Sequence, residues 1–173
     1  MSLIGRKGAK VVYIWSDLHL GHTNIIRYCN RPFADVEEMN KVLLRNWRET
    51  IKGDDTIINL GDFCFRWTSE RIQNTLANLP GHKILILGNH DREHNVDWWR
   101  NAGFQEVYPY PIIYKQWYIL SHEDVFLNDK MPYINIHGHR HQVKLDSKCH
   151  INVSVECLDY KPVLFDELIK DNV

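Results

Sequence analysis

Histidine and acidic residues stand where apolar, strand-like runs of this chain end. Because side chains at the carboxyl ends of neighbouring strands meet at one edge of a sheet, we expect them to form a single site. Imidazole and carboxylate groups are ligands for divalent transition metals. The polar residues that follow the runs are Asp17 and His19, Asp62, Asn89 with His90 and Asp91, His122, and finally His137, His139 and His141.

The spacing inside these groups favours metal binding. In extended backbone, residues two positions apart point to the same side, which would aim Asp17 and His19 at one ion. The same holds for His139 and His141. A turn aspartate next to a surface histidine is the alternative for the first pair. Three histidines within five positions have few structural uses, although the role of His137 stays open.

The remaining members of the predicted site have different chemistry. Asp62 has two carboxylate oxygens and can bridge two cations, while Asn89 offers a neutral oxygen. His90 stands next to Asp91, a carboxylate able to fix the tautomer of an imidazole and to raise its basicity. We therefore expect Asp91 to orient the His90 imidazole.

Four residues are candidate substrate contacts. His22 and Asn24 lie near the start of a short predicted helix, whose free N–H groups could face an anion; a plain polar turn is equally compatible. Arg66 and Arg140 could contact a phosphate oxygen, and a surface position is the alternative for both. Other residues could bind a nucleotide by stacking or by phosphate contact, although each of them also suits a core or surface position: Phe63, Phe65, Trp67, Arg27, Arg31 and Arg92.

Sequence patterns place these residues on a mixture of strands and helices. We expect buried strands over residues 10–15, 56–60, 83–87 and 133–136, a hairpin over 112–120 and an edge strand over 151–155. Thr23 is the predicted cap of a helix over 24–29. Asp35 and Glu38 form a capping box before a longer helix. Further helices are predicted over 69–79, over 97–102 and after Pro162.

Composition limits the class of protein. The chain has 173 residues, 44% hydrophobic and 25% charged, which suits a single domain over residues 1–173. A net charge of -1 gives no strong attraction to nucleic acid or membrane. No apolar run approaches the roughly 20 residues of a membrane span, and the run after residue 10 is too short for a signal peptide. The four cysteines form no CxxC pair, which favours reduced thiols and a cytoplasmic location.

The ordered blocks D-x-H, G-D, G-N-H-D, a lone histidine after a strand, and G-H-x-H resemble the calcineurin-like metallophosphoesterase superfamily. Together they extend from residue 17 to residue 141. The run S-D-L-H-L-G-H-T-N-I-I followed by N-R-P-F is similar to a subgroup of small bacterial and phage phosphoesterases. One departure is visible, because many members read G-D-x-x-D where Phe63 to Phe65 follow Asp62 here.

The resemblance implies an α/β (α+β) fold, an αββα four-layer sandwich of two mixed β-sheets flanked by helices. It also implies two divalent metal ions, with Mn, Fe, Ni, Co and Zn all compatible with nitrogen and oxygen ligands. By the same resemblance, His90 would be the catalytic acid or charge stabiliser, helped by Asp91. The resemblance assigns Asp17, His19 and His141 to the first metal, Asn89, His122 and His139 to the second, and Asp62 to the bridge.

These expectations converge on hydrolysis of a small phosphate ester, a phosphodiester or nucleotide-like molecule. Two divalent metal ions bring four positive charges, and Asp17 and Asp62 return two negative ones. The site therefore stays net positive even with a bridging hydroxide, which suits in-line attack of that hydroxide on an anionic ester. A non-catalytic metal-binding interaction scaffold on the same fold is the alternative. A non-haem iron oxygenase needs only two histidines and a carboxylate, and the predicted set is larger. A homo-oligomer is compatible with the sequence.

Overall fold

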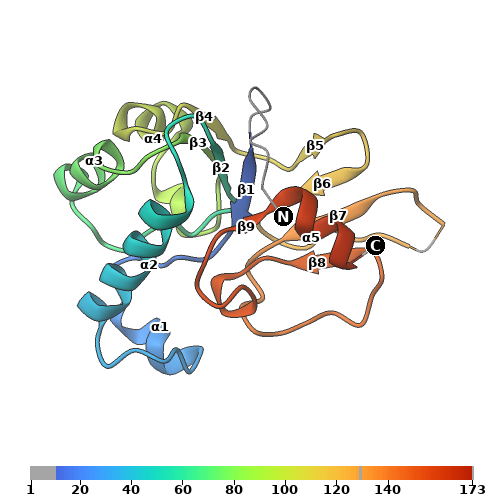
Figure 1. Ribbon diagram of the computed structural model, residues 1–173, viewed down its shortest axis with the longest axis horizontal. Helices are drawn as coiled ribbons and strands as arrows, with labels where there is room; N and C mark the ends of the chain where they lie inside the picture. The colour runs from blue at the N-terminus through green and yellow to red at the C-terminus, as the bar shows by residue number, and fades with distance from the viewer. Residues whose placement is uncertain (1–10, 129, 173) are drawn as a thin grey trace, which may run out of the picture.

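Two mixed β-sheets form the centre of the structure, a computed structural model that describes residues 11–128 and 130–172. The five-stranded sheet has the order β4-β3-β2-β1-β9, with β9 antiparallel to its neighbour, and the four-stranded sheet has the order β5-β6-β7-β8. Figure 1 shows both sheets. The strands are β1 Val12–Trp15, β2 Thr56–Asn59, β3 His82–Ile86, β4 Glu106–Tyr108, β5 Ile112–Tyr114, β6 Tyr118–Leu120, β7 Ile134–His137, β8 His150–Asn152 and β9 Val163–Leu164.

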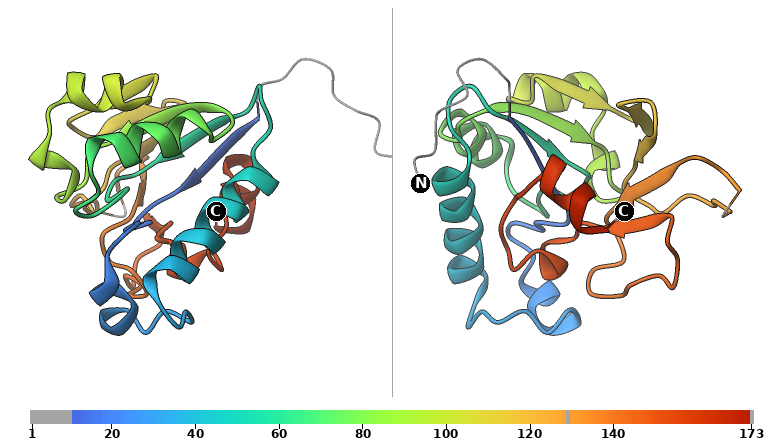
Figure 2. Two further views of the ribbon diagram at one scale, coloured as in Figure 1. Left: turned by 90° about the vertical axis from the view of Figure 1, so that its left-hand side faces the viewer. Right: turned by 45° about the vertical axis from the view of Figure 1, so that its right-hand side comes forward.

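Three helices cover one face of the five-stranded sheet: α2 (Val36–Thr50), α3 (Ser69–Ala77) and α4 (Val96–Ala102) (Figures 1 and 2). Their apolar side chains pack with Trp15, Ile57 and Leu85 in one core. The predicted start of α2 is confirmed, because the Asp35 carboxylate accepts the backbone N–H of Glu38 at 2.8 Å. Helix α1 (Thr23–Tyr28) and the 3-10 turns Asp91–Glu93 and Val155–Cys157 lie in the connections.

A second core fills the space between the sheets. Ile14, Ile58 and Ile86 of the five-stranded sheet meet Leu120 and Ile136 of the four-stranded sheet there. Neighbouring residues of β1, β2 and β3 thus point into different cores, which explains why the predicted strands read as continuous apolar runs.

Helix α5 (Phe165–Asn172) contributes to this second core and contacts the four-stranded sheet. The Phe165 ring lies 4.9 Å from that of Tyr114 and 5.1 Å from that of Tyr118. The predicted sandwich of two mixed sheets with flanking helices is therefore confirmed. No helix in the described part of the chain has the length and apolar character needed to cross a membrane.

Several local predictions need correction. Thr23 is the first residue of α1 and does not cap it; His22 holds the cap position without a side-chain hydrogen bond. Strands β4 and β9 were not predicted, because their three and two residues, respectively, are too few to show a period. Residues 1–10, in which no signal peptide is expected, lie outside the described residues, and so does Val173.

Candidate metal centre and its cleft

Loops that follow the strands of both sheets carry the predicted ligands to one place. Strands β1, β2 and β3 run parallel, so their carboxyl ends share one edge of the sheet, and β6 and β7 also run parallel. Backbone hydrogen bonds from Asp17 to Gly61 (3.0 Å) and from His19 to Asp62 (2.9 Å) join the loops after β1 and β2. These bonds hold the loops that carry Asp17 and Asp62 together as one unit.

Asp17 also connects this unit to the other sheet. Its Oδ2 accepts a hydrogen bond from the Ser154 hydroxyl and another from the backbone N–H of His139, both at 2.9 Å. Gly138 makes the second contact possible, because a Cβ on this residue would overlap Ser16 and the Asp17 carboxylate. The glycine of G-H-x-H therefore permits the close approach of the two sheets.

Five of the seven predicted ligands have left-handed backbone. This conformation is uncommon outside glycine and costs on the order of 1–3 kcal/mol per residue, so it persists only where surrounding contacts impose it. The finding corrects the expectation that extended backbone aligns the ligand pairs, since their side chains converge from tight turns instead. The residues and their φ values are Asp17 (61°), His19 (50°), Asp62 (53°), His139 (64°) and His141 (49°).

The first predicted group of ligands is assembled. Donor atoms of Asp17, His19 and His141 all lie within 4.8 Å of one another. Asp17 Oδ1 and His19 Nε2 are buried and have no hydrogen-bond partner among the described residues. These two atoms are 3.9 Å apart, a separation that two metal–ligand bonds of about 2.0–2.2 Å can span. A buried acceptor pair without partners is costly, and a divalent cation would satisfy both atoms.

The second predicted group surrounds His122. Its Nε2 lies 3.0 Å from Asn89 Oδ1 and 3.2 Å from His139 Nδ1. Asp62 connects the two groups, because its Oδ2 is 3.4 Å from His19 Nε2 and 3.5 Å from His122 Nε2. The structure thus brings all seven predicted ligands together and places Asp62 between the two sets.

The carboxylates of the centre favour positive charge on the histidines near them. Burial lowers the pKa of an imidazole, yet the hydrogen bond and charge of Asp62, with the charge of Asp17, raise the pKa of His122 to about 9. Against the same effect of burial, hydrogen bonds to Cys29 and Glu156 and the charge of Asp17 raise the pKa of His141 to about 10. Both shifts show that the carboxylates favour positive charge at this centre, and imidazole ligands must be deprotonated to bind a metal ion.

His90 lies at the border of the centre. Its Nε2 is 4.0 Å from Asp62 Oδ2, and its side chain is 34% exposed. The expected contact between Asp91 and His90 is not present. The Asp91 carboxylate is fully buried and accepts backbone N–H groups from Asp62 (2.7 Å), Gly88 (2.9 Å) and Phe63 (3.1 Å).

The Asp91 side chain points away from His90, because backbone N–H groups of the loops that contain Asp62 and Gly88 converge on its carboxylate. Its role is therefore to position Asp62 and the loop of Asn89, and our assignment of it as a helper of His90 is corrected. Burial, and then the charge of Asp62, raise the pKa of Asp91, while the N–H groups of Gly88 and Phe63 act in the opposite direction.

Two buried charged residues behind the first group were not predicted to support it. The Arg31 guanidinium donates to the carbonyls of Asp17 (2.7 Å) and Leu18 (2.9 Å). Its Nε and Nη2 also reach Glu156 Oε1 at 2.9 and 2.8 Å. The same Glu156 oxygen accepts from His141 Nδ1 at 2.9 Å. Arg31 and Glu156 thus orient both ends of the first ligand group. The only signal in the sequence was an acid directly after the apolar alternation 151–155.

A cleft of about 550 Å³ opens above the ligands. Its lining includes two predicted substrate contacts, His22 and Arg140. His22 stacks on Phe65 at 4.3 Å, and the Arg140 guanidinium is held by Asp124 at 2.6 and 3.0 Å. Asn24 is exposed and is not part of the lining. These contacts leave His22 beside the centre and Arg140 already engaged by an acid.

Other candidates lie away from the cleft. The Arg66 guanidinium lies over the Phe65 ring at 5.1 Å and does not line the cleft. Phe63 is buried in the helix-side core, and Trp67 packs under Arg71 at 4.2 Å. His137 is buried, and its Nδ1 donates to the carbonyl of Gly138 at 2.8 Å. It belongs to none of the metal-binding groups found among the described residues.

The two-sheet α/β sandwich gathers imidazole, carboxylate and amide donors at its strand ends, next to an open cleft. These donors define the class of candidate metal-binding proteins. Comparison with known proteins makes this class more specific. Residues 10–173 match the family model described as calcineurin-like phosphoesterase, so the chain belongs to this family. Membership indicates metal-dependent hydrolysis of phosphoesters.

Individual relatives carry little functional information. The chain is 34% identical to the uncharacterized protein MJ1445 of Methanocaldococcus jannaschii, covering 92% of this chain and 89% of that protein. It is 32% identical to the Gene 66 protein of Mycobacterium phage L5, covering 72% of this chain and 56% of the phage protein. The crystal structure of the protein of unknown function AQ665 from Aquifex aeolicus is similar, with a TM-score of 0.70 and 28% identity over 94% of this chain and 99% of that one.

Proposed function

We propose that this protein hydrolyses a phosphodiester or nucleotide-like ester at a centre of two divalent metal ions, in the cytoplasm. The observation that carries the proposal is the pair of buried, unpartnered donor atoms Asp17 Oδ1 and His19 Nε2, which lie 3.9 Å apart below an open cleft. No disulfide joins any two of the four cysteines, all of which lie in the described part of the chain, and this agrees with a reducing compartment.

When bound, the metal ions would neutralise phosphoryl oxygens and lower the pKa of a water for in-line attack. Asp17, His19 and His141 would hold one ion, and Asn89, His122 and His139 would hold the other, with Asp62 shared. These donors are nitrogen and oxygen atoms without a thiolate, which suits Mn, Fe, Ni, Co or Zn.

The other residues of the cleft act on the ester itself. His90 is partly exposed and lies next to Asp62, so its imidazole can give a proton to the leaving oxygen. His22 and Phe65 stand on the same side, because both rings lie near that of His90, at 6.1 and 5.2 Å. The leaving group would therefore depart on the side of the cleft formed by His22, Phe65 and His90.

The test compares hydrolysis of bis-p-nitrophenyl phosphate by metal-stripped protein and by protein reloaded with Mn²⁺. We expect activity only after reloading and its loss in Asp62→Asn, with Asp54→Asn as the matched control in a solvent-exposed turn. Equal activity of the stripped sample would refute the proposal. Tight metal uptake without turnover on any monoester, diester or cyclic nucleotide would favour the interaction scaffold instead.

A further inference from the structure

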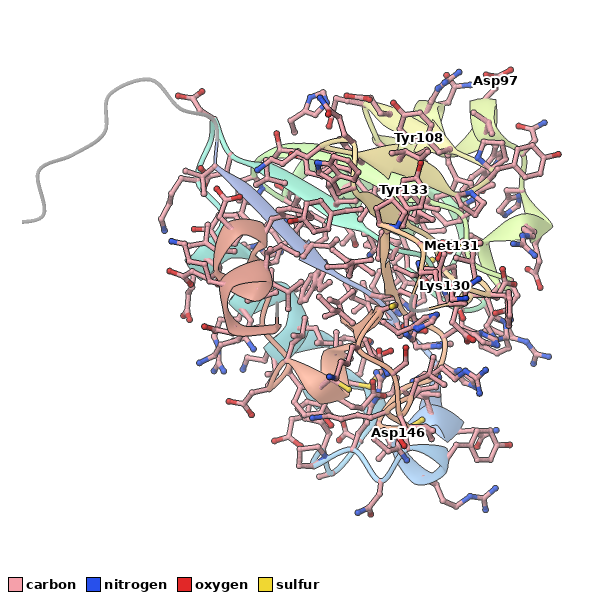
Figure 3. The ribbon with its side chains drawn as sticks, turned by 90° about the vertical axis from the view of Figure 1, so that its right-hand side faces the viewer. Asp97, Tyr108, Lys130, Met131, Tyr133 and Asp146 are labelled. Atoms are coloured by element: carbon pink, nitrogen blue, oxygen red, sulfur yellow. The ribbon has the colours of Figure 1, made fainter. Side chains whose placement is uncertain are left out.

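One wall of the cleft is apolar. Ile25, Tyr28 and Cys29 line it from α1 and the residue after it, and Val143 lines it from the turn that follows His141. Tyr28 is 60% exposed and Val143 is 54% exposed, although both are large hydrophobic residues. The α1 segment and the loop that carries Asp146 lie at the same end of the molecule (Figures 1 and 3). Two exposed apolar side chains thus face one cleft from separate segments.

We infer that this wall is a subsite for an uncharged, apolar organic group of the ester, such as an aromatic ring. The inference rests on the proposed function and adds the class of substrate. The wall contains no carboxylate, imidazole, amine or guanidinium group, and burial of Tyr28 and Val143 by a ligand would remove apolar surface from water.

The charges of the cleft support an uncharged group. Among the described residues that line it, Arg140 is the only arginine or lysine, and both of its contacting nitrogens are held by Asp124 at 2.6 and 3.0 Å. Arg27 packs on the Tyr28 ring at 5.5 Å and is not part of the lining. Among the described residues that line it, the cleft therefore offers no unengaged arginine or lysine for a second phosphate, which disfavours polyphosphates and acidic peptides.

The position of the wall favours a diester over a monoester. The rings of His90 and His141 lie 5.3 and 5.2 Å from that of His19, and the Tyr28 ring lies 6.3 Å from that of His22. The wall therefore borders the side of the cleft that holds His22 and His90. A diester keeps one organic substituent after the leaving group departs, and that substituent can cover the wall, whereas a monoester has no second substituent.

The test uses two diesters with the same leaving group, phenyl p-nitrophenyl phosphate and methyl p-nitrophenyl phosphate. Metal-loaded wild-type protein should favour the phenyl ester by roughly tenfold in kcat/KM, since a ring covers on the order of 50 Å² more apolar surface. Tyr28→Ala and Val143→Ala should lower kcat/KM for the phenyl ester more than for the methyl ester, and so remove most of this preference. Tyr110→Ala is the matched control, because Tyr110 is 76% exposed and does not line the cleft.

A binding measurement separates this inference from the proposed function. Calorimetric titration of metal-loaded protein with phenylphosphonate and methylphosphonate should show the same roughly tenfold preference, also lost in Tyr28→Ala. Hydrolysis of both diesters without a phenyl preference, or a preference that survives in both variants, would overturn the subsite and leave the proposed function standing. A phenyl preference in binding without turnover would support the subsite and refute the hydrolysis.

Discussion

Replacement of Glu156 by glutamine tests how the first ligand group is held. Glu156 Oε1 accepts hydrogen bonds from His141 Nδ1 (2.9 Å) and from Arg31 Nε and Nη2 (2.9 and 2.8 Å). Glutamine keeps the shape and one acceptor oxygen but removes the negative charge. The substitution therefore changes electrostatics with little change in packing.

The size of the effect follows from these contacts. Breaking a buried ion pair costs about 3–5 kcal/mol when a charge is left alone. Arg31 keeps its two carbonyl acceptors, at Asp17 and Leu18, and a neutral acceptor on the variant side chain, so we expect a loss of about 2–3 kcal/mol in the free energy of unfolding. Loss of a partner that orients a metal-ligating histidine typically weakens metal binding about 10–100-fold.

Calorimetric titration of metal-free protein with Mn²⁺ would measure this loss. We expect weaker binding at one of two sites in Glu156→Gln, because His122, Asn89 and His139 do not contact Glu156 in any described interaction. Glu123→Gln is the control, since Glu123 forms an exposed pair with Arg92 at 3.0 Å and should change stability by less than about 1 kcal/mol. Unchanged unfolding and two unchanged binding steps in Glu156→Gln would refute the reasoning.

Three further predictions concern other parts of the centre. Gly138→Ala should lower both stability and metal uptake, because its Cβ would overlap Ser16 and Asp17, whereas Gly53→Ala, with open space around it, should do neither; equal melting temperatures and metal content for the two would contradict this. His90→Ala should slow turnover of an alkyl ester about 10²–10⁴-fold at unchanged metal content, with a smaller effect on p-nitrophenyl esters, whose leaving group needs no proton; an unaltered alkyl ester rate would exclude the role. Asp91→Asn should lower the free energy of unfolding by at least about 1–3 kcal/mol in a urea titration, since an amide cannot accept all three N–H groups, and wild-type stability would argue against the positioning role.

Much of the fold could be predicted because its strands are long apolar runs that end in polar residues. The hairpin around Lys115 and Gln116 and the capping residue Asp35 followed from local chemistry, and both are present. Strand β9 could not be predicted, since its two residues depend entirely on pairing with Tyr13 and Ile14. Local signals are strong only where the chain itself, and not a distant partner, determines the conformation.

The convergence of the ligands was also predictable, whereas their support was not. Motif order placed Asp17 and His141 together, but nothing in the sequence links Arg31 to Glu156 across 125 positions. The expected pair of His90 and Asp91 failed for a related reason. Adjacency in sequence suggested a contact, while the carboxylate found better partners in three converging backbone N–H groups. Supporting contacts are set by tertiary structure and leave little trace in spacing.

The contacts of Asp17 belong both to the candidate metal centre and to the junction of the two sheets. Its backbone pairs with the loop after β2, its carbonyl accepts from Arg31, and its Oδ2 accepts from Ser154 and from the backbone of His139. The left-handed backbone at the ligands persists because these contacts impose it. A ligand substitution that lowers activity therefore also alters how the sheets are joined. Stability must accordingly be measured beside metal uptake for each ligand variant, so that a lost cation is distinguished from a loosened sandwich.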